Sequence, residues 1–180
     1  YGDIYRWKDI KATNTDIESV YGALYGVINN ANFLLDNVDK VKANTNSDKE
    51  LDKLEQYQGE AYFARALAYS ELIKCFCKAY DSDEQAAKEL GLVLTEHYYG
   101  NEPQKRASLK ESYDFVLRDL DKAAEYLKVD EDFTGSLYNE IYFNEYTCHA
   151  LRARVSLYMH KYDDAIKYAS KVIGSKYYTL

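Results

Sequence analysis

The sequence has little of several residue types, and each shortage excludes a class of protein. One proline in 180 residues, with 47% hydrophobic residues, excludes a proline-rich disordered chain and a collagen-like one. Its uninterrupted apolar stretches are only a few residues long, far short of the roughly 20 that span a bilayer as a helix. The 23 basic residues are outnumbered by 30 acidic ones, giving a net charge of -7. No local cluster of Lys and Arg offsets that charge, which argues against nucleic acid and anionic lipid as partners.

Cysteine is also scarce, and its spacing gives no disulfide framework. The three cysteines, Cys75, Cys77 and Cys148, cannot all pair. Cys75 and Cys77 are two positions apart on a predicted helix, where their side chains point to different faces and cannot bridge each other. We expect buried free thiols rather than a metal-binding or redox pair.

What is present is a helical pattern over most of the chain. Apolar residues recur at three- to four-residue spacing, which is typical of amphipathic helices. Asp16 is a suitable N-cap for the first long helix, and Ser108 with Glu111 three residues later forms a capping box. Gly91 and Gly174 are placed to end the third and the last of the predicted helices. The predicted helices cover residues 16–39, 48–80, 83–90, 108–128, 143–160 and 163–173.

The last two predicted helices are joined by only a few residues, so they must be antiparallel neighbours. Alanines stand where the two helices would touch, as in a tetratricopeptide repeat. In the last helix we expect Ala165, Ile166, Ala169, Val172 and Ile173 to face inward. The sequence therefore predicts an all-α bundle of tetratricopeptide-like antiparallel helical hairpins, with a long connector between residues 92 and 107 that lacks helical period. We expect residues 1–180 to form a single helical domain.

Charged residues in the alanine-rich helix require partners. Glu60 and Arg65 lie near its middle, where an unpaired charge is costly. We expect a structural polar network of Glu60, Arg65 and Asp119, the last from the neighbouring predicted helix. Contact with a ligand is the alternative for these side chains.

The search for catalytic chemistry is negative. There is no G-x-S-x-G, H-E-x-x-H, phosphate loop or G-x-G-x-x-G pattern, so neither a hydrolase motif nor a nucleotide site is indicated. The three histidines, His97, His149 and His160, lie too far apart along the predicted helices to share a metal. We therefore expect no catalytic residues, no metal and no cofactor, and a protein that is not an enzyme.

Tyrosine is abundant: it occurs 20 times, against six phenylalanines and one tryptophan. A sugar site needs an exposed flat ring with amide or carboxylate groups beside it, because sugars present apolar C–H faces edged by hydroxyls. Two places meet this requirement and are our candidate ligand-binding residues: Tyr5 with Trp7 near the start, and Tyr98, Tyr99 and Asn101 in the connector. Packing of Tyr5 and Trp7 on the first long helix is the alternative.

Several short segments, taken in order over nearly the whole chain, resemble the SusD/RagB family. No one of them is specific, but their order and spacing are. They are Ile28-Asn29-Asn30-Ala31-Asn32, Gly59-Glu60-Ala61, Gly91-Leu92-Val93-Leu94, Arg106-Ala107-Ser108 and Ala150-Leu151-Arg152-Ala153.

The resemblance implies a non-catalytic glycan-capture lipoprotein of the outer membrane, which passes its ligand to a SusC-type TonB-dependent transporter. It also implies a longer parent protein, held on the membrane by a lipid anchor that is absent from this chain, with the present residues as its helical scaffold. A tetratricopeptide adaptor that binds a peptide or protein partner is the alternative function. A carbohydrate hydrolase would need a cleft with two carboxylates, and nothing raises one acidic pair above the others.

Overall fold

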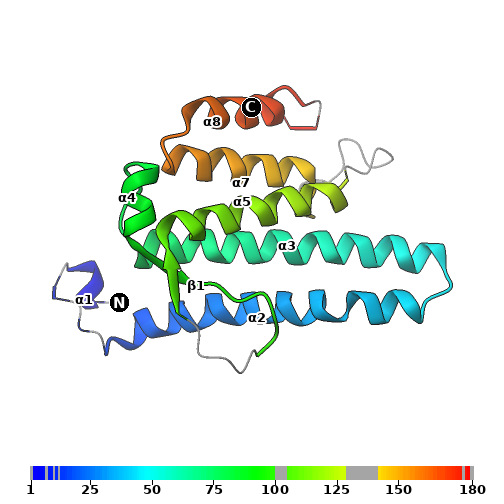
Figure 1. Ribbon diagram of the computed structural model, residues 1–180, viewed down its shortest axis with the longest axis horizontal. Coiled ribbons are helices and arrows are strands. Elements are labelled where there is room, and N and C mark those ends of the chain that lie inside the picture. Colours follow the sequence, from blue (N-terminus) through cyan, green and yellow to red (C-terminus); the bar gives the residue numbers. More distant parts are fainter. Residues whose placement is uncertain are drawn as a thin grey trace.

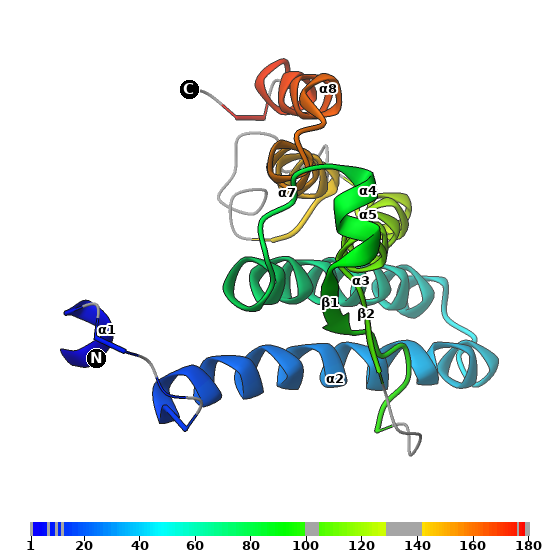
Figure 2. The ribbon, with the colours of Figure 1, turned by 60° about the vertical axis from the view of Figure 1, so that its left-hand side comes forward.

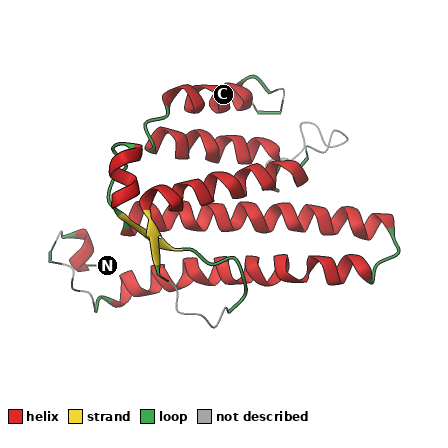
Figure 3. Cartoon of the chain, viewed as in Figure 1, coloured by secondary structure: helices red, strands yellow, loops and turns green. Residues whose placement is uncertain are grey.

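The computed structural model describes residues 2–6, 8–9, 11, 13–99, 105–128, 142–175 and 177–178. The fold is almost entirely helical, with one small two-stranded sheet (Figure 3). The elements in chain order are α1 (Gly2–Tyr5), α2 (Thr15–Ala43), α3 (Asp48–Phe76), α4 (Asp83–Lys88), β1 (Leu90–Val93), β2 (Arg106–Ser108), α5 (Leu109–Tyr126), α7 (Glu145–Tyr158) and α8 (Tyr162–Ile173).

The long helices are stacked as antiparallel neighbours. Figure 1 shows α2 and α3 side by side at the base, with α5, α7 and α8 following in order above α3. Figure 2 shows the same order after rotation, so the stacking is not an effect of the view. Each helix mainly contacts the next one along the stack, as in a helical repeat protein. The prediction of an all-α fold built from tetratricopeptide-like hairpins is confirmed.

The core lies where α3 is enclosed by α2 and α5. Ile28, Tyr69, Leu72 and Val116 are fully buried there, and α7 adds Val155. Small residues let the helices approach closely along this seam, as the alanine pattern indicated. None of the described helices is both long and apolar enough to cross a membrane.

The start of α2 differs from the prediction. Asn14, not Asp16, is the N-cap: its Oδ1 accepts hydrogen bonds from the backbone N–H groups of Asp16 and Ile17, both 3.1 Å. Asp16 lies inside the first turn, where its negative charge still faces the positive end of the helix dipole. At α5 the predicted capping box is present, with Ser108 and Glu111 each capping the other's backbone N–H.

The connector contains the sheet, which the periodicity did not reveal. β1 pairs antiparallel with β2 at its two ends, and α4 ends at Lys88 rather than at Gly91. Gly91 instead lies in β1, against the first turn of α5. A Cβ atom there would be 2.2 Å from the Ser112 Oγ and 2.3 Å from the Ser108 carbonyl oxygen. Only glycine fits this close approach.

In α8 the prediction for the inward face is wrong for two residues. Ala165, Ala169 and Val172 are half-buried, but Ile166 is 65% exposed and Ile173 is exposed as well. The reason is that α8 packs on α7 alone, so only one narrow stripe of the helix is covered.

The cysteines are free in the structure. Cys148 is buried, Cys77 is half-buried and Cys75 is exposed. Burial raises the pKa of the Cys148 thiol to about 12, which keeps it protonated and unreactive. The expectation of buried thiols is therefore wrong for Cys75, which lies on the solvent side of α3.

Candidate functional site

The connector is held against α2 by hydrogen bonds to its backbone. After β1, residues 94–99 run along α2 (Figure 1). The amide nitrogen of Asn32 donates to the carbonyl oxygens of Thr95 and His97, at 3.1 and 3.3 Å. From α3, the Tyr69 hydroxyl accepts the backbone N–H of Thr95 at 2.8 Å. A segment without secondary structure thereby satisfies its backbone groups and takes a fixed path.

Two further residues of α2 fix the tip of this segment. Asp36 accepts the Tyr98 N–H through Oδ2 and contacts His97 Nδ1 through Oδ1, both at 2.8 Å. The Oδ1 of Asn29 accepts the Tyr99 N–H at 3.2 Å. Burial acts to raise the pKa of the Asp36 carboxyl, but the hydrogen bonds from Tyr98 and His97 outweigh it and hold that pKa below its ordinary value.

Asn32 is itself oriented by a buried ion pair. Arg65 donates from Nη1 to the Asn32 Oδ1 at 2.6 Å. The same guanidinium makes two parallel bonds to Asp119, from Nε at 2.6 Å and from Nη2 at 3.0 Å. Because the amide oxygen of Asn32 is occupied by Arg65, its nitrogen faces the connector. The network therefore joins α2, α3, α5 and the connector.

The structure does not bring Glu60 into this network. Glu60 is half-buried and accepts a hydrogen bond from Gln56 at 3.0 Å. It lies five positions before Arg65 on α3, and at 3.6 residues per turn the two side chains leave different sides of the helix. The third member of the network, beside Arg65 and Asp119, is Asn32 and not the predicted Glu60.

An aromatic cluster lies exposed at the tip of the connector. Tyr98 and Tyr99 contact each other edge to face, with ring centroids 4.4 Å apart, and Tyr98 contacts Phe33 of α2 at 5.0 Å. Tyr99 is 71% exposed and Phe33 54%. Tyr99 also has a left-handed backbone, with φ of 41°, a conformation that non-glycine residues seldom adopt. We call Phe33, Tyr98 and Tyr99 the connector aromatic cluster.

Beside this cluster is a groove of about 380 Å³. Its floor is α2, where Gly22 and Gly26 leave the helix surface bare, and Asn29 and His97 supply polar groups along its side. Tyr99 forms one wall. A flat ring beside amide and imidazole groups is the arrangement that a sugar ring requires.

The described candidate residues from the sequence lie in two places. Tyr98 and Tyr99 come together in the connector aromatic cluster. Tyr5 is strongly exposed in α1, beyond the N-terminal end of α2 and apart from the connector (Figures 1 and 2). Trp7 and Asn101 lie outside the described residues.

Sequence reasoning missed Phe33. It follows Asn32 on α2 and falls outside the buried stripe of Ile28, Ala31 and Val38. A large apolar residue off the stripe was the available signal. In the part of the chain that the structure describes, no group of three or more His, Cys, Asp or Glu residues could hold a metal ion.

Solved structures similar to this one share its fold at low sequence identity. A SusD superfamily protein from Bacteroides fragilis has 23% identity and a TM-score of 0.73, covering 95% of this chain and 37% of that one. A laminarin-binding SusD-like protein has 21% identity and a TM-score of 0.62, covering 87% of this chain and 30% of that one. A structure with a xylogluco-oligosaccharide has 17% identity and a TM-score of 0.69, covering 95% and 32%.

The chain thus spans about a third of the length of these structures. No functionally curated protein matches it. A SusD-like family model, described as "Starch-binding associating with outer membrane", matches residues 1–157. This chain therefore belongs to the SusD-like family.

Proposed function

We propose that this chain is the helical scaffold of a glycan-capture protein and that its connector aromatic cluster contacts the glycan. The observation that carries the proposal is a pair of exposed tyrosine rings whose backbone is fixed by side chains of α2. Rings held in place before binding lose little conformational entropy when a sugar packs on them. The groove beside Tyr99 adds amide and imidazole groups for the sugar hydroxyls.

The family supports the same proposal from another direction. The matching family model is described as starch-binding. Of the similar structures, one is of a laminarin-binding SusD-like protein and another is with a xylogluco-oligosaccharide. We infer binding and release without bond breaking, followed by transfer to a SusC-type TonB-dependent transporter. Attachment of the whole protein to the outer membrane through a lipid belongs to the same proposal.

Affinity electrophoresis tests the site. The 180-residue chain is run through gels that contain laminarin, xyloglucan or starch, together with Tyr99→Ala, Tyr5→Ala and Tyr162→Ala. Tyr162 is a matched control, because it is also an exposed tyrosine but lies on α8. We expect at least one glycan to slow the chain and Tyr99→Ala to weaken binding about tenfold. Tyr162→Ala should migrate like the unsubstituted 180-residue chain.

Two results would contradict the proposal. One is the absence of retardation by every glycan, including in a wider panel of plant and host polysaccharides. The other is retardation that Tyr99→Ala leaves unchanged. Loss of retardation in Tyr5→Ala alone would transfer the site to the N-terminal segment.

A further inference from the structure

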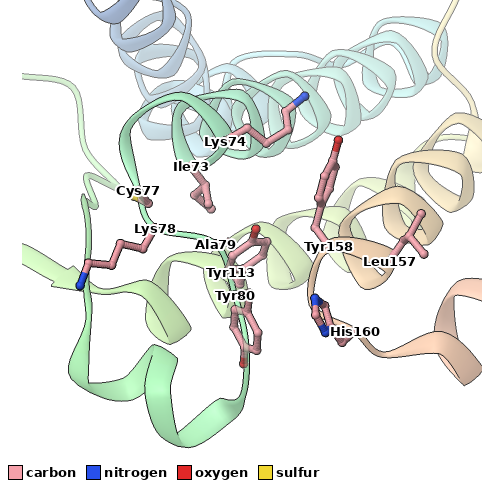
Figure 4. Close-up of a pocket in the computed structure, with 10 residues that line it drawn as sticks. All are labelled: Ile73, Lys74, Cys77, Lys78, Ala79, Tyr80, Tyr113, Leu157, Tyr158 and His160. Carbon is pink, nitrogen blue, oxygen red and sulfur yellow. The ribbon is translucent and has the colours of Figure 1, made fainter.

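A second pocket shares no lining residue with the connector groove. It is formed where the C-terminal ends of α3 and α7 meet the first half of α5 (Figure 4). Its volume is about 440 Å³, within the usual range for small-molecule sites. Ile73 and Leu157 give it apolar walls, and three tyrosines line it. We call it the junction pocket.

The most informative residue in the junction pocket is Tyr113. Its side chain is nearly enclosed, since the residue is only 5% exposed. Among the described residues its hydroxyl has no hydrogen-bond partner, although the ring packs edge to face on Tyr80 at 5.2 Å. Figure 4 shows the two hydroxyls pointing in opposite directions. The Tyr80 hydroxyl donates to Asp83 at 2.7 Å, outside the pocket, whereas that of Tyr113 points into it.

The hydroxyl is not one of the fully enclosed polar atoms that lack a hydrogen bond among the described residues, so it is open to the pocket and can donate to a group bound there. Burial, together with the nearby Cys77 and Tyr158, raises the pKa of Tyr113 to about 12. The hydroxyl is therefore protonated at neutral pH and available as a donor. A bound group with an acceptor atom can therefore take a hydrogen bond from Tyr113.

The remaining polar groups of the lining are also donors. Lys74 and Lys78 border the pocket, and each already has one acidic partner, Glu71 at 2.5 Å and Glu89 at 2.8 Å. An ammonium group has three protons, so each lysine keeps donors for a ligand. Among the described residues that line the pocket there is no carboxylate. A neutral sugar needs acceptors for its hydroxyl protons, and this lining offers few.

His160 adds a third nitrogen group, held in place by an unusual backbone. It lies just after α7 with φ of 58°. The N–H of His160 bonds to the Leu157 carbonyl at 3.1 Å, and that of Lys161 to the Ser156 carbonyl at 2.9 Å. This is a Schellman helix ending, in which glycine normally takes the left-handed position. A histidine there is strained, and its ring borders the pocket (Figure 4).

We propose that the junction pocket binds a single sugar ring that carries a carboxylate, that is, a uronic acid residue. The Tyr113 hydroxyl and the lysine ammonium groups donate to the carboxylate and ring oxygens, and the Tyr158 ring packs against the C–H face of the sugar. The choice of a sugar rests on the proposed function, whereas the pocket and its excess of donors are independent of the connector groove.

Isothermal titration calorimetry of the 180-residue chain with free sugars tests the proposal. Glucuronate and galacturonate are compared with glucose and galactose, which differ only at the carboxylate carbon. We expect saturable binding of at least one uronate and binding of its neutral counterpart that is at least tenfold weaker. Tyr113→Phe keeps the ring and removes only the hydroxyl, and should weaken uronate binding about tenfold.

The control variants separate the alternatives. Tyr57→Phe should leave uronate affinity unchanged, because Tyr57 is an exposed tyrosine of α3 that does not line the pocket. Lys78→Gln removes one of the ammonium donors and should weaken uronate binding. Because the Lys78 side chain is 70% exposed, the change should leave the fold intact. Tyr99→Ala should not alter uronate binding, and this distinguishes failure at the connector from failure here. Equal affinity for uronate and neutral sugar, no binding of either uronate, or equal losses in Tyr57→Phe and Tyr113→Phe would overturn the proposal.

Discussion

Arg65 and Asp119 are 54 positions apart in the sequence and make two parallel hydrogen bonds, of 2.6 and 3.0 Å, with both side chains almost fully buried. Such a pair is weak evidence for stability by itself, since both ions lose their hydration. Its particular feature here is the third bond, from Arg65 to Asn32. That bond connects the core of the helical stack to the segment that presents Tyr98 and Tyr99.

The first prediction concerns loss of one partner of this pair. Asp119→Ala leaves the Arg65 guanidinium buried without a counter-ion, and we expect the free energy of unfolding to fall by about 3–5 kcal/mol. Urea denaturation of the parent and the variant measures this. The double variant Arg65→Met/Asp119→Leu removes both charges at similar volume and should lose less than Asp119→Ala alone. An equal or greater loss in the double variant would mean that the ion pair itself stabilises the fold.

The second prediction separates positioning of the connector from contact with the glycan. Asn32→Ala removes the donor to the Thr95 and His97 carbonyls. We expect faster hydrogen exchange over residues 94–99 and weaker glycan retention, although Asn32 is fully buried and cannot touch a ligand. Hydrogen–deuterium exchange with mass spectrometry measures the first effect. Asn30→Ala, an exposed change on the same helix, is the control and should leave both unchanged.

The third prediction is a dependence on pH. The pKa of Asp36 is lowered in the folded protein, so its stabilising contribution is fully present above its ordinary value of 3.8 and is lost as pH falls through the folded value. Stability measured by denaturant from pH 6 down toward pH 2 should therefore fall more in the parent than in Asp36→Asn. Parallel curves for the two proteins would show that the contacts of Asp36 with Tyr98 and His97 contribute nothing to folding.

The fourth prediction compares two glycines. Gly91→Ala places a Cβ atom within 2.3 Å of the Ser108 carbonyl oxygen, and we expect it to destabilise the protein by about 1–3 kcal/mol. Gly22→Ala on α2 meets nothing within 4 Å and should instead stabilise by about 0.5–1 kcal/mol, because alanine is the better helix former. Thermal unfolding followed by circular dichroism distinguishes the two signs.

The fifth prediction concerns the strained ending of α7. His160→Gly relieves the left-handed backbone at φ of 58°, so we expect unfolding to require about 1 kcal/mol more than in the parent. The same change should weaken uronate binding if the imidazole contributes to the junction pocket. A destabilised His160→Gly would show that the contact of the ring with Tyr162, at 6.0 Å, outweighs the strain.

The sequence alone determined the helices and their antiparallel order. Apolar spacing, the Ser108–Glu111 capping box and the short link between α7 and α8 all act within a few residues of one another. For this reason they are visible in the order of the letters. The family resemblance depends on the same kind of local segment, repeated in sequence over most of the chain, and the family match over residues 1–157 agrees with it.

The tertiary structure decided which distant residues meet. Arg65 contacts Asn32 and not Glu60, because helical geometry turns Glu60 to another side of α3 and the packing of α2 brings Asn32 within 2.6 Å. Phe33 joins Tyr98 across 65 positions of sequence only because the connector folds back on α2. The physical reason is range: periodicity and capping are fixed by neighbouring residues, whereas these contacts depend on how whole helices pack.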